Sequence, residues 1–198
     1  MNKNLVAAAV VGLFAANATA FNLVGVESPR QHGAHICSFN LSLDPNNPTV
    51  EPRGGQAMLV FSYDAAVDDS AWSYPQATAI PTGNPAAVVT NVDGKEVTVM
   101  VNSPVNPSYV TIQLEVYEKG TNNFNASAVT VGYLLGDVNQ TRVVTVADKG
   151  LANAEIGRPL NCNQGNRRFR YDVNVDGVIN TTDTSIINSQ ITRALPQR

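Results

Sequence analysis

The residues most able to do chemistry form a run of twelve, in which side chains that carry oxygen alternate with other residues around one glycine, Gly177. A calcium ion takes about six to eight oxygen ligands, and a short loop supplies them from its first, third, fifth, seventh, ninth and twelfth positions. In this run, residues 172–183, those positions hold Asp172, Asn174, Asp176, Val178, Asn180 and Asp183, with Val178 offering its backbone carbonyl. The run is called the second loop, because a similar one precedes it in the sequence. The pattern predicts a strong calcium site; the alternative is a polar turn before a helix.

The same pattern occurs thirty-five residues earlier, in a first loop that begins at Asp137. Its corresponding ligand positions hold Asp137, Asn139, Thr141, Val143, Thr145 and Asp148. Thr141 replaces a carboxylate, and Arg142 stands where the second loop has its glycine. Calcium affinity follows the charge and rigidity of the ligand set, so we expect a weaker or reshaped site here. The alternative is an empty loop closed by hydrogen bonds.

A helix is expected after the second loop, because Ile186, Ile187 and Ile191 lie at helical spacing within residues 184–193. Thr181 or Thr182 is the expected N-cap. Two loop–helix units in tandem, with Asp at the twelfth loop position, resemble the dockerin domain, a relative of the EF-hand, over roughly residues 135–196.

The resemblance to dockerins implies a protein partner, since dockerins bind cohesin domains through the outer faces of their helices. The matching positions in this chain are Asn153, Arg158, Asn188 and Arg193. A helix face that only meets solvent explains the same polar residues.

The start of the chain predicts export. Residues 1–20 combine a positively charged start, an apolar run and the small residues Ala18-Thr19-Ala20, as in a signal peptide cleaved after Ala20. The apolar run is too short to be a permanent membrane span. Acidic residues outnumber basic ones by 16 to 13, which gives no reason to expect nucleic acid as a partner. We expect a secreted protein, extracellular or on the cell surface.

Two cysteines, Cys37 and Cys162, lie far apart in the sequence. In an exported protein an isolated pair is most simply a disulfide, here joining the N-terminal part of the chain to the connection between the two loops. The alternative is two separate buried thiols.

Residues 21–135 read as strands, because apolar and polar residues alternate in segments such as 97–101 and 110–116, with turn residues such as Asp93-Gly94 between them. We expect an immunoglobulin-like antiparallel β-sandwich, followed at residues 136–198 by a small α-helical module, the dockerin-like calcium-binding domain. The segments Ser28 to Gly33 and Val50 to Gly55 resemble β-domains that precede dockerin-like repeats in secreted bacterial proteins. No flexible linker separates the parts, which favours a rigid unit.

No catalytic motif stands out. His32 and His35 are three residues apart, but without further ligands they are expected to be surface residues or hydrogen-bonded fixtures. We therefore expect a non-catalytic protein in which calcium rigidifies a two-domain unit for extracellular assembly or adhesion. One form of this hypothesis is a module that docks onto a cohesin-like partner. The other is a self-polymerising filament or surface-layer subunit, with residues 21–26 as an exposed segment that joins neighbours by strand addition.

Overall fold

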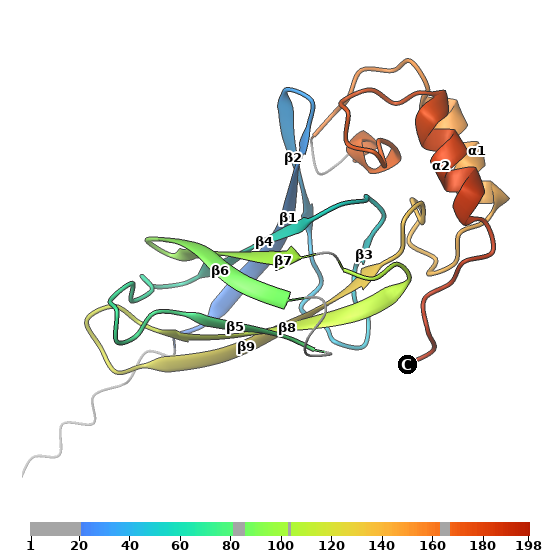
Figure 1. The fold of residues 1–198 in the computed structure, drawn as a ribbon. Coiled ribbons are helices and arrows are strands. Elements are labelled where there is room, and N and C mark those ends of the chain that lie inside the picture. Colours follow the sequence, from blue (N-terminus) through green and yellow to red (C-terminus); the bar gives the residue numbers. More distant parts are fainter. Residues whose placement is uncertain (1–20, 81–85, 103, 163–166) are drawn as a thin grey trace, which may run out of the picture.

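The computed structural model describes residues 21–80, 86–102, 104–162 and 167–198. The expected signal peptide, residues 1–20, lies outside the described residues. Within the described part the fold is mainly β, with two sheets that pack against each other and a small helical part beside one end of them (Figure 1).

The larger sheet has five strands in the order β2-β1-β4-β7-β6, and its neighbours are antiparallel. Its strands are β1 (Leu23–His32), β2 (His35–Asn40), β4 (Ala57–Tyr63), β6 (Ala86–Asp93) and β7 (Glu96–Asn102). The smaller sheet has four strands in the order β3-β9-β8-β5. These are β3 (Val50–Glu51), β5 (Gln76–Ile80), β8 (Ser108–Tyr117) and β9 (Phe124–Tyr133). The expectation of an entirely antiparallel sandwich is wrong in one place, because β3 runs parallel to β9.

The sandwich core follows from the period-two alternation of the strands. On β8 every second residue from Val110 to Val116 is buried, and the residues between them are exposed or half-buried. Strand β7 alternates in the same way and buries Val97, Val99 and Val101 in the same cluster. Strands β7 and β8 therefore each place one apolar face between the sheets, where burial contributes about 25 cal/mol for each Å² of apolar surface.

Residues 21–26 are not a free joining segment, which corrects the strand-addition expectation. Phe21 is buried and its ring stacks on Tyr63 with centroids 5.0 Å apart. Leu23, Gly25 and Val26 belong to β1 and pair with β4 inside the protein's own sheet. This apolar segment completes the core of its own chain.

The helical part consists of α1 (Val146–Glu155), the short 3-10 helix η1 (Arg168–Tyr171) and α2 (Thr181–Gln190). Helix α2 begins earlier than expected because Asn180, not Thr181 or Thr182, is its N-cap and accepts a hydrogen bond from the N–H of Thr182. It ends at Gln190, before Thr192, whose φ of 81° is not helical. In the described part of the chain, no helix is long and apolar enough to cross a bilayer.

The sandwich and the helical part share their packing. Strand β9 ends at Tyr133, three residues follow it before the first loop begins at Asp137, and the last of them, Gly136, donates its N–H to the carbonyl of Pro52 at 2.9 Å. Phe169 of η1 is fully buried in the sandwich core. A second buried cluster draws on both sides of the expected boundary at 135/136: Val50, Leu134, Val138, Val144, Ala152, Val173, Ile187 and Leu195.

Candidate metal centre

The second loop is organised around two buried carboxylates, at its first and twelfth positions. Asp172 accepts hydrogen bonds from the backbone N–H groups of Asp176 at 3.1 Å and Gly177 at 2.8 Å. Asp183 accepts from the backbone N–H groups of Val173 and Asn180, both at 2.9 Å. The loop is thus wrapped around both acidic groups, which hold its ends together.

The other expected ligand positions lie nearer to solvent. The Asn174 Nδ2 donates to Asp176 Oδ2 at 2.9 Å, and Asp176 Oδ1 accepts from the Val178 N–H at 2.9 Å. The Asn180 Nδ2 lies 3.4 Å from the Val178 carbonyl oxygen, and its Oδ1 caps α2. Among the described residues no group of three or more His, Cys, Asp or Glu side chains is gathered so that it could hold a metal ion. The donor set of this loop also includes amide and backbone carbonyl oxygens.

The charge of the loop fits a cation. Burial raises the pKa of Asp183, and the negative charge of Asp172 raises it further. Two buried carboxylates that repel one another and are hydrogen-bonded by neutral backbone groups would be stabilised by a positive ion among the loop oxygens. A hard divalent cation such as calcium suits an all-oxygen donor set.

The first loop repeats this hydrogen-bond pattern. Asp137 accepts from the N–H groups of Thr141 at 3.0 Å and Arg142 at 2.7 Å. Asp148 accepts from the N–H groups of Asn139 at 3.2 Å and Thr145 at 2.9 Å. Burial raises the pKa of Asp137 to about 6, and the charge of Asp148 adds to the effect.

The two loops differ in the side chains that line them. In the first loop the Thr141 hydroxyl lies 2.8 Å from Asn139 Oδ1 and 3.1 Å from the Val143 carbonyl, so three expected ligands contact one another. Arg142 has a φ of 71°, and Gly177 has a φ of 94° at the same position of the second loop. The Arg142 guanidinium turns away and donates to Asn47 at 3.0 Å.

The repeat extends beyond the loops. Each loop lies against the segment that follows the helix of the other unit: the Thr192 N–H donates to Val144 at 3.0 Å, and the Gly157 N–H donates to Ile179 at 3.1 Å. Both residue pairs are related by the thirty-five-residue period of the sequence. The two units are therefore related by an internal pseudo-symmetry.

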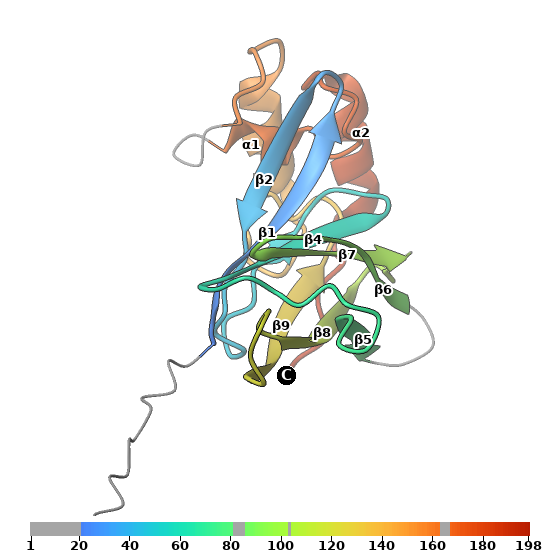
Figure 2. The ribbon, with the colours of Figure 1, turned by 90° about the vertical axis from the view of Figure 1, so that its left-hand side faces the viewer.

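The hairpin of β1 and β2 extends from the sandwich to the second loop (Figure 2). A Cβ on Gly177 would lie 3.0 Å from the Gly33 Cα and 3.1 Å from the His32 carbonyl oxygen. A Cβ on Gly33 would lie 3.0 Å from the Asp176 carbonyl oxygen. The backbones of the hairpin and the loop thus meet at a pair of glycines. A Cβ at position 177 would obstruct this contact, and glycine also adopts the positive φ of this position without strain.

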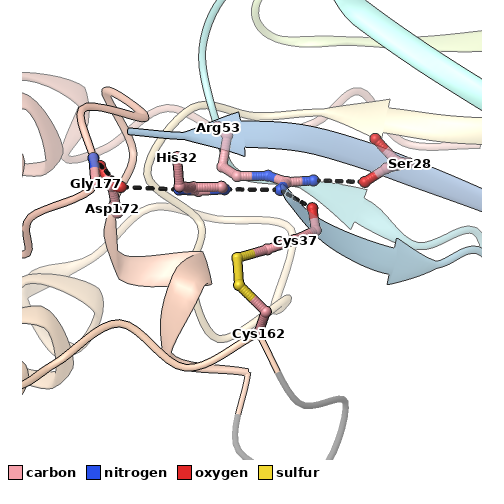
Figure 3. Close-up of a disulfide and its surroundings, with 7 residues drawn as sticks. All are labelled: Ser28, His32, Cys37, Arg53, Cys162, Asp172 and Gly177. Atoms are coloured by element: carbon pink, nitrogen blue, oxygen red, sulfur yellow. Dashed lines mark hydrogen bonds and ion pairs between the residues drawn. A yellow bond between two sulfur atoms is a disulfide. The ribbon is translucent and has the colours of Figure 1, made fainter. Parts of the chain in front are cut away.

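A buried polar network joins the same loop to the sandwich (Figure 3). The His32 Nδ1 lies 2.8 Å from Asp172 Oδ2, and Arg53 Nη1 lies 3.0 Å from His32 Nε2. The Arg53 guanidinium also pairs with Glu51, from Nε at 2.6 Å and from Nη2 at 2.7 Å. Arg53 compensates the charge of Glu51, whose pKa is lowered although burial alone would raise it.

The sequence did not identify His32, Arg53 or Glu51 as part of the site. His35 is exposed, as expected for a surface residue. His32 is fully buried and hydrogen-bonded, as the other expectation for the pair had it. The available signal was the alternation of Ser28, Arg30 and His32, polar residues that are all buried on one face of β1. Nothing in that alternation states which distant segment they meet.

The structure contains the disulfide between Cys37 and Cys162, whose Cα atoms are 4.8 Å apart. It closes beside the polar network, because the Cys37 carbonyl accepts from Arg53 Nη1 at 3.1 Å (Figure 3). The expected pairing of the two cysteines is thereby confirmed, and the alternative of two separate thiols is wrong.

The four residues of the expected partner face, Asn153, Arg158, Asn188 and Arg193, are exposed on or just after the two helices. Three of their side chains have recorded intramolecular contacts: Arg193 donates to the Asn106 carbonyl at 3.2 Å, Asn188 accepts from Lys149 at 3.0 Å, and Arg158 lies 3.8 Å from Glu155.

In comparisons with known proteins, no family model and no curated protein matches this chain.

Proposed function

We propose that this is a secreted, non-catalytic structural protein in which calcium in the second loop rigidifies the union of β-sandwich and loop–helix repeat for extracellular assembly or adhesion. The observation that carries the proposal is the pair of buried carboxylates, Asp172 and Asp183, held by backbone N–H groups in one loop. Calcium would be held by Asp172, Asn174, Asp176, Val178, Asn180 and Asp183, and would neutralise the repulsion between the two buried acids.

The place of the loop supports a structural role. The second loop packs its backbone against Gly33 of the β1–β2 hairpin, and the Gly54 N–H donates to the Val173 carbonyl at 3.0 Å. Ordering the loop therefore orders the surface against which the sandwich packs. In this proposal the sandwich is immunoglobulin-like, the repeat is dockerin-like, and the first loop is a weaker second calcium site.

Calcium titration by isothermal calorimetry tests the proposal. Wild-type protein is expected to bind calcium tightly at one site, and Asp172→Ala is expected to lose that site. Glu115→Gln is a control, since it removes a carboxylate from an exposed position on β8. Equal calcium uptake by wild type and Asp172→Ala would refute the assignment of the second loop.

A second candidate function is docking onto a cohesin-like partner through the helices. It is favoured by the exposure of Asn153 and Asn188 at equivalent positions of the repeat. Negative-stain microscopy with calcium and with chelator separates docking from self-assembly. Calcium-dependent filaments would contradict the simple docking function, and monodisperse particles under all conditions would contradict the filament.

A further inference from the structure

His32 stands where the sandwich and the second loop meet. It is the last residue of β1, it is fully buried, and 140 residues of sequence separate it from Asp172. Its ring contacts a loop carboxylate on one side and the Arg53 guanidinium on the other. His35 is its register partner on β2 and is exposed, whereas His32 is buried in contact with the loop.

The hydrogen bonds define how the ring is protonated. An arginine side chain has donors and no acceptor, so Arg53 Nη1 donates to His32 Nε2. The ring proton is then on Nδ1 and is donated to Asp172 Oδ2. Asp172 Oδ2 receives a second hydrogen bond from the Gly177 N–H, whereas Oδ1 receives one from the Asp176 N–H. Oδ1 therefore has a further lone pair that could coordinate a cation.

We propose that His32 is a positioning residue that couples calcium binding in the second loop to the buried Glu51–Arg53 pair of the sandwich. This inference rests on the proposed calcium site. His32 fixes the orientation of the Asp172 carboxylate, as partners beyond the direct ligands do in metal sites. It acts through Asp172 and does not bind calcium itself.

Arg53 is well placed to hold the ring. Its guanidinium is fixed by both oxygens of Glu51, by the Ser28 carbonyl at 2.9 Å and by the Cys37 carbonyl at 3.1 Å. It also lies over the Phe39 ring, 4.5 Å from the centroid. An anchor fixed on so many sides leaves His32 few alternative orientations, so the loop's first ligand is oriented before the ion arrives.

Coupling between two sites is reciprocal. If the Arg53–His32 contact favours the calcium-binding orientation of Asp172, then calcium must in turn favour that contact. The consequence is that calcium in the loop stabilises the tip of the β1–β2 hairpin, where His32 and Gly33 lie against the loop.

Three variants test the role of His32. His32→Leu removes both hydrogen bonds and is expected to weaken calcium binding by about tenfold. His32→Asn can place its Nδ2 near the position of the ring Nδ1 and is expected to stay within about threefold of wild type. His35→Asn changes the exposed histidine of the same hairpin and is expected to bind as wild type does. Calorimetry measures affinity, and circular dichroism checks folding.

Hydrogen exchange of the wild-type protein is a second readout, and it does not depend on any variant folding. Calcium is expected to slow exchange at the amides of residues 31–36 about tenfold. Unchanged exchange at these amides, or calcium binding by folded His32→Leu with wild-type affinity, would overturn the coupling. If wild-type protein binds no calcium at all, the proposed function fails first; if it binds calcium without either effect, the role of His32 alone fails.

Discussion

At the scale of single residues, Arg142 and Gly177 show how the residue at the sixth loop position determines the backbone strain of the loop. Both have a positive φ at the sixth loop position, 71° for Arg142 and 94° for Gly177. A residue with a Cβ is disfavoured in this region by about 1–2 kcal/mol. The first loop keeps the shape of the second in spite of this cost, because Asp137 and Asp148 accept the same set of backbone hydrogen bonds.

Arg142→Gly is expected to raise the free energy of unfolding by about 1 kcal/mol, since it relieves the backbone strain and the hydrogen bond that it removes, to Asn47, is exposed. Adding Thr141→Asp restores a carboxylate at the fifth position and is expected to create a second tight calcium site. Denaturant unfolding and calorimetry measure the two effects. Arg158→Gly is the control for replacing an arginine by glycine. If the Thr141→Asp, Arg142→Gly double variant binds the same number of calcium ions as wild type, the prediction is contradicted.

Asp137 gives a pH dependence with a definite sign. In the folded, calcium-free protein its pKa is raised to about 6 from the ordinary value of 3.8. A folded state with a raised pKa binds the proton more tightly than the unfolded chain. The contribution of Asp137 to stability is therefore complete below pH 3.8 and is lost as the pH rises through about 6. A carboxyl-carbon NMR titration without calcium should show this group titrating near 6; titration below 4 would contradict it.

At the scale of the elements, period-two alternation in the sequence predicted strands such as β7 and β8 because each has one face on the core. The ligand spacing predicted both loops, and the helical spacing of Ile186, Ile187 and Ile191 predicted the helix after the second one. The start of α2 was less well predicted, since Asn180 serves as helix cap as well as expected ligand. The contact between hairpin and loop could not be predicted, because it depends on distances between segments that the sequence does not contain.

Gly33→Ala tests that contact. Gly33 and Gly94 have almost the same φ, 56° and 58°, but a Cβ at Gly33 would meet the Asp176 carbonyl at 3.0 Å, whereas a Cβ at Gly94 would have no neighbour within 4 Å. Both substitutions are expected to cost about 1–2 kcal/mol in backbone strain. Only Gly33→Ala should also weaken calcium binding. Equal effects of the two variants on calcium affinity would show that the hairpin does not support the loop.

At the scale of the whole molecule, three features join the sandwich to the helical part: the shared apolar clusters, the polar network from Glu51 to Asp172, and the disulfide. The disulfide could be predicted from the number of cysteines and the expected compartment. The polar network could not, because Glu51, Arg53 and His32 belong to different segments and each has an ordinary explanation by itself.

Glu51→Gln is expected to cost about 3–5 kcal/mol, since it leaves the buried Arg53 without its counter-charge. Chemical unfolding measures the loss, and Glu115→Gln on the exposed face of β8 is expected to change stability little. A loss below about 1 kcal/mol would contradict a structural role for the pair.

Replacing both cysteines by serine is expected to lower stability by about 2–4 kcal/mol, because the crosslink joins residues 125 positions apart and restricts the unfolded chain. Unfolding with and without reductant measures the effect. Reductant should change the wild-type protein and leave the double-serine variant unchanged; a wild-type protein insensitive to reductant under unfolding conditions would contradict this.

Differential scanning calorimetry with and without calcium tests whether calcium in the second loop fixes sandwich and repeat as one unit. Calcium is expected to move a single unfolding transition to higher temperature and, at a concentration one hundred times the dissociation constant, to raise the free energy of unfolding by about 2.7 kcal/mol. The same transition should not respond in Asp172→Ala. A sandwich that unfolds at a temperature independent of calcium would contradict a structural role for calcium in the second loop.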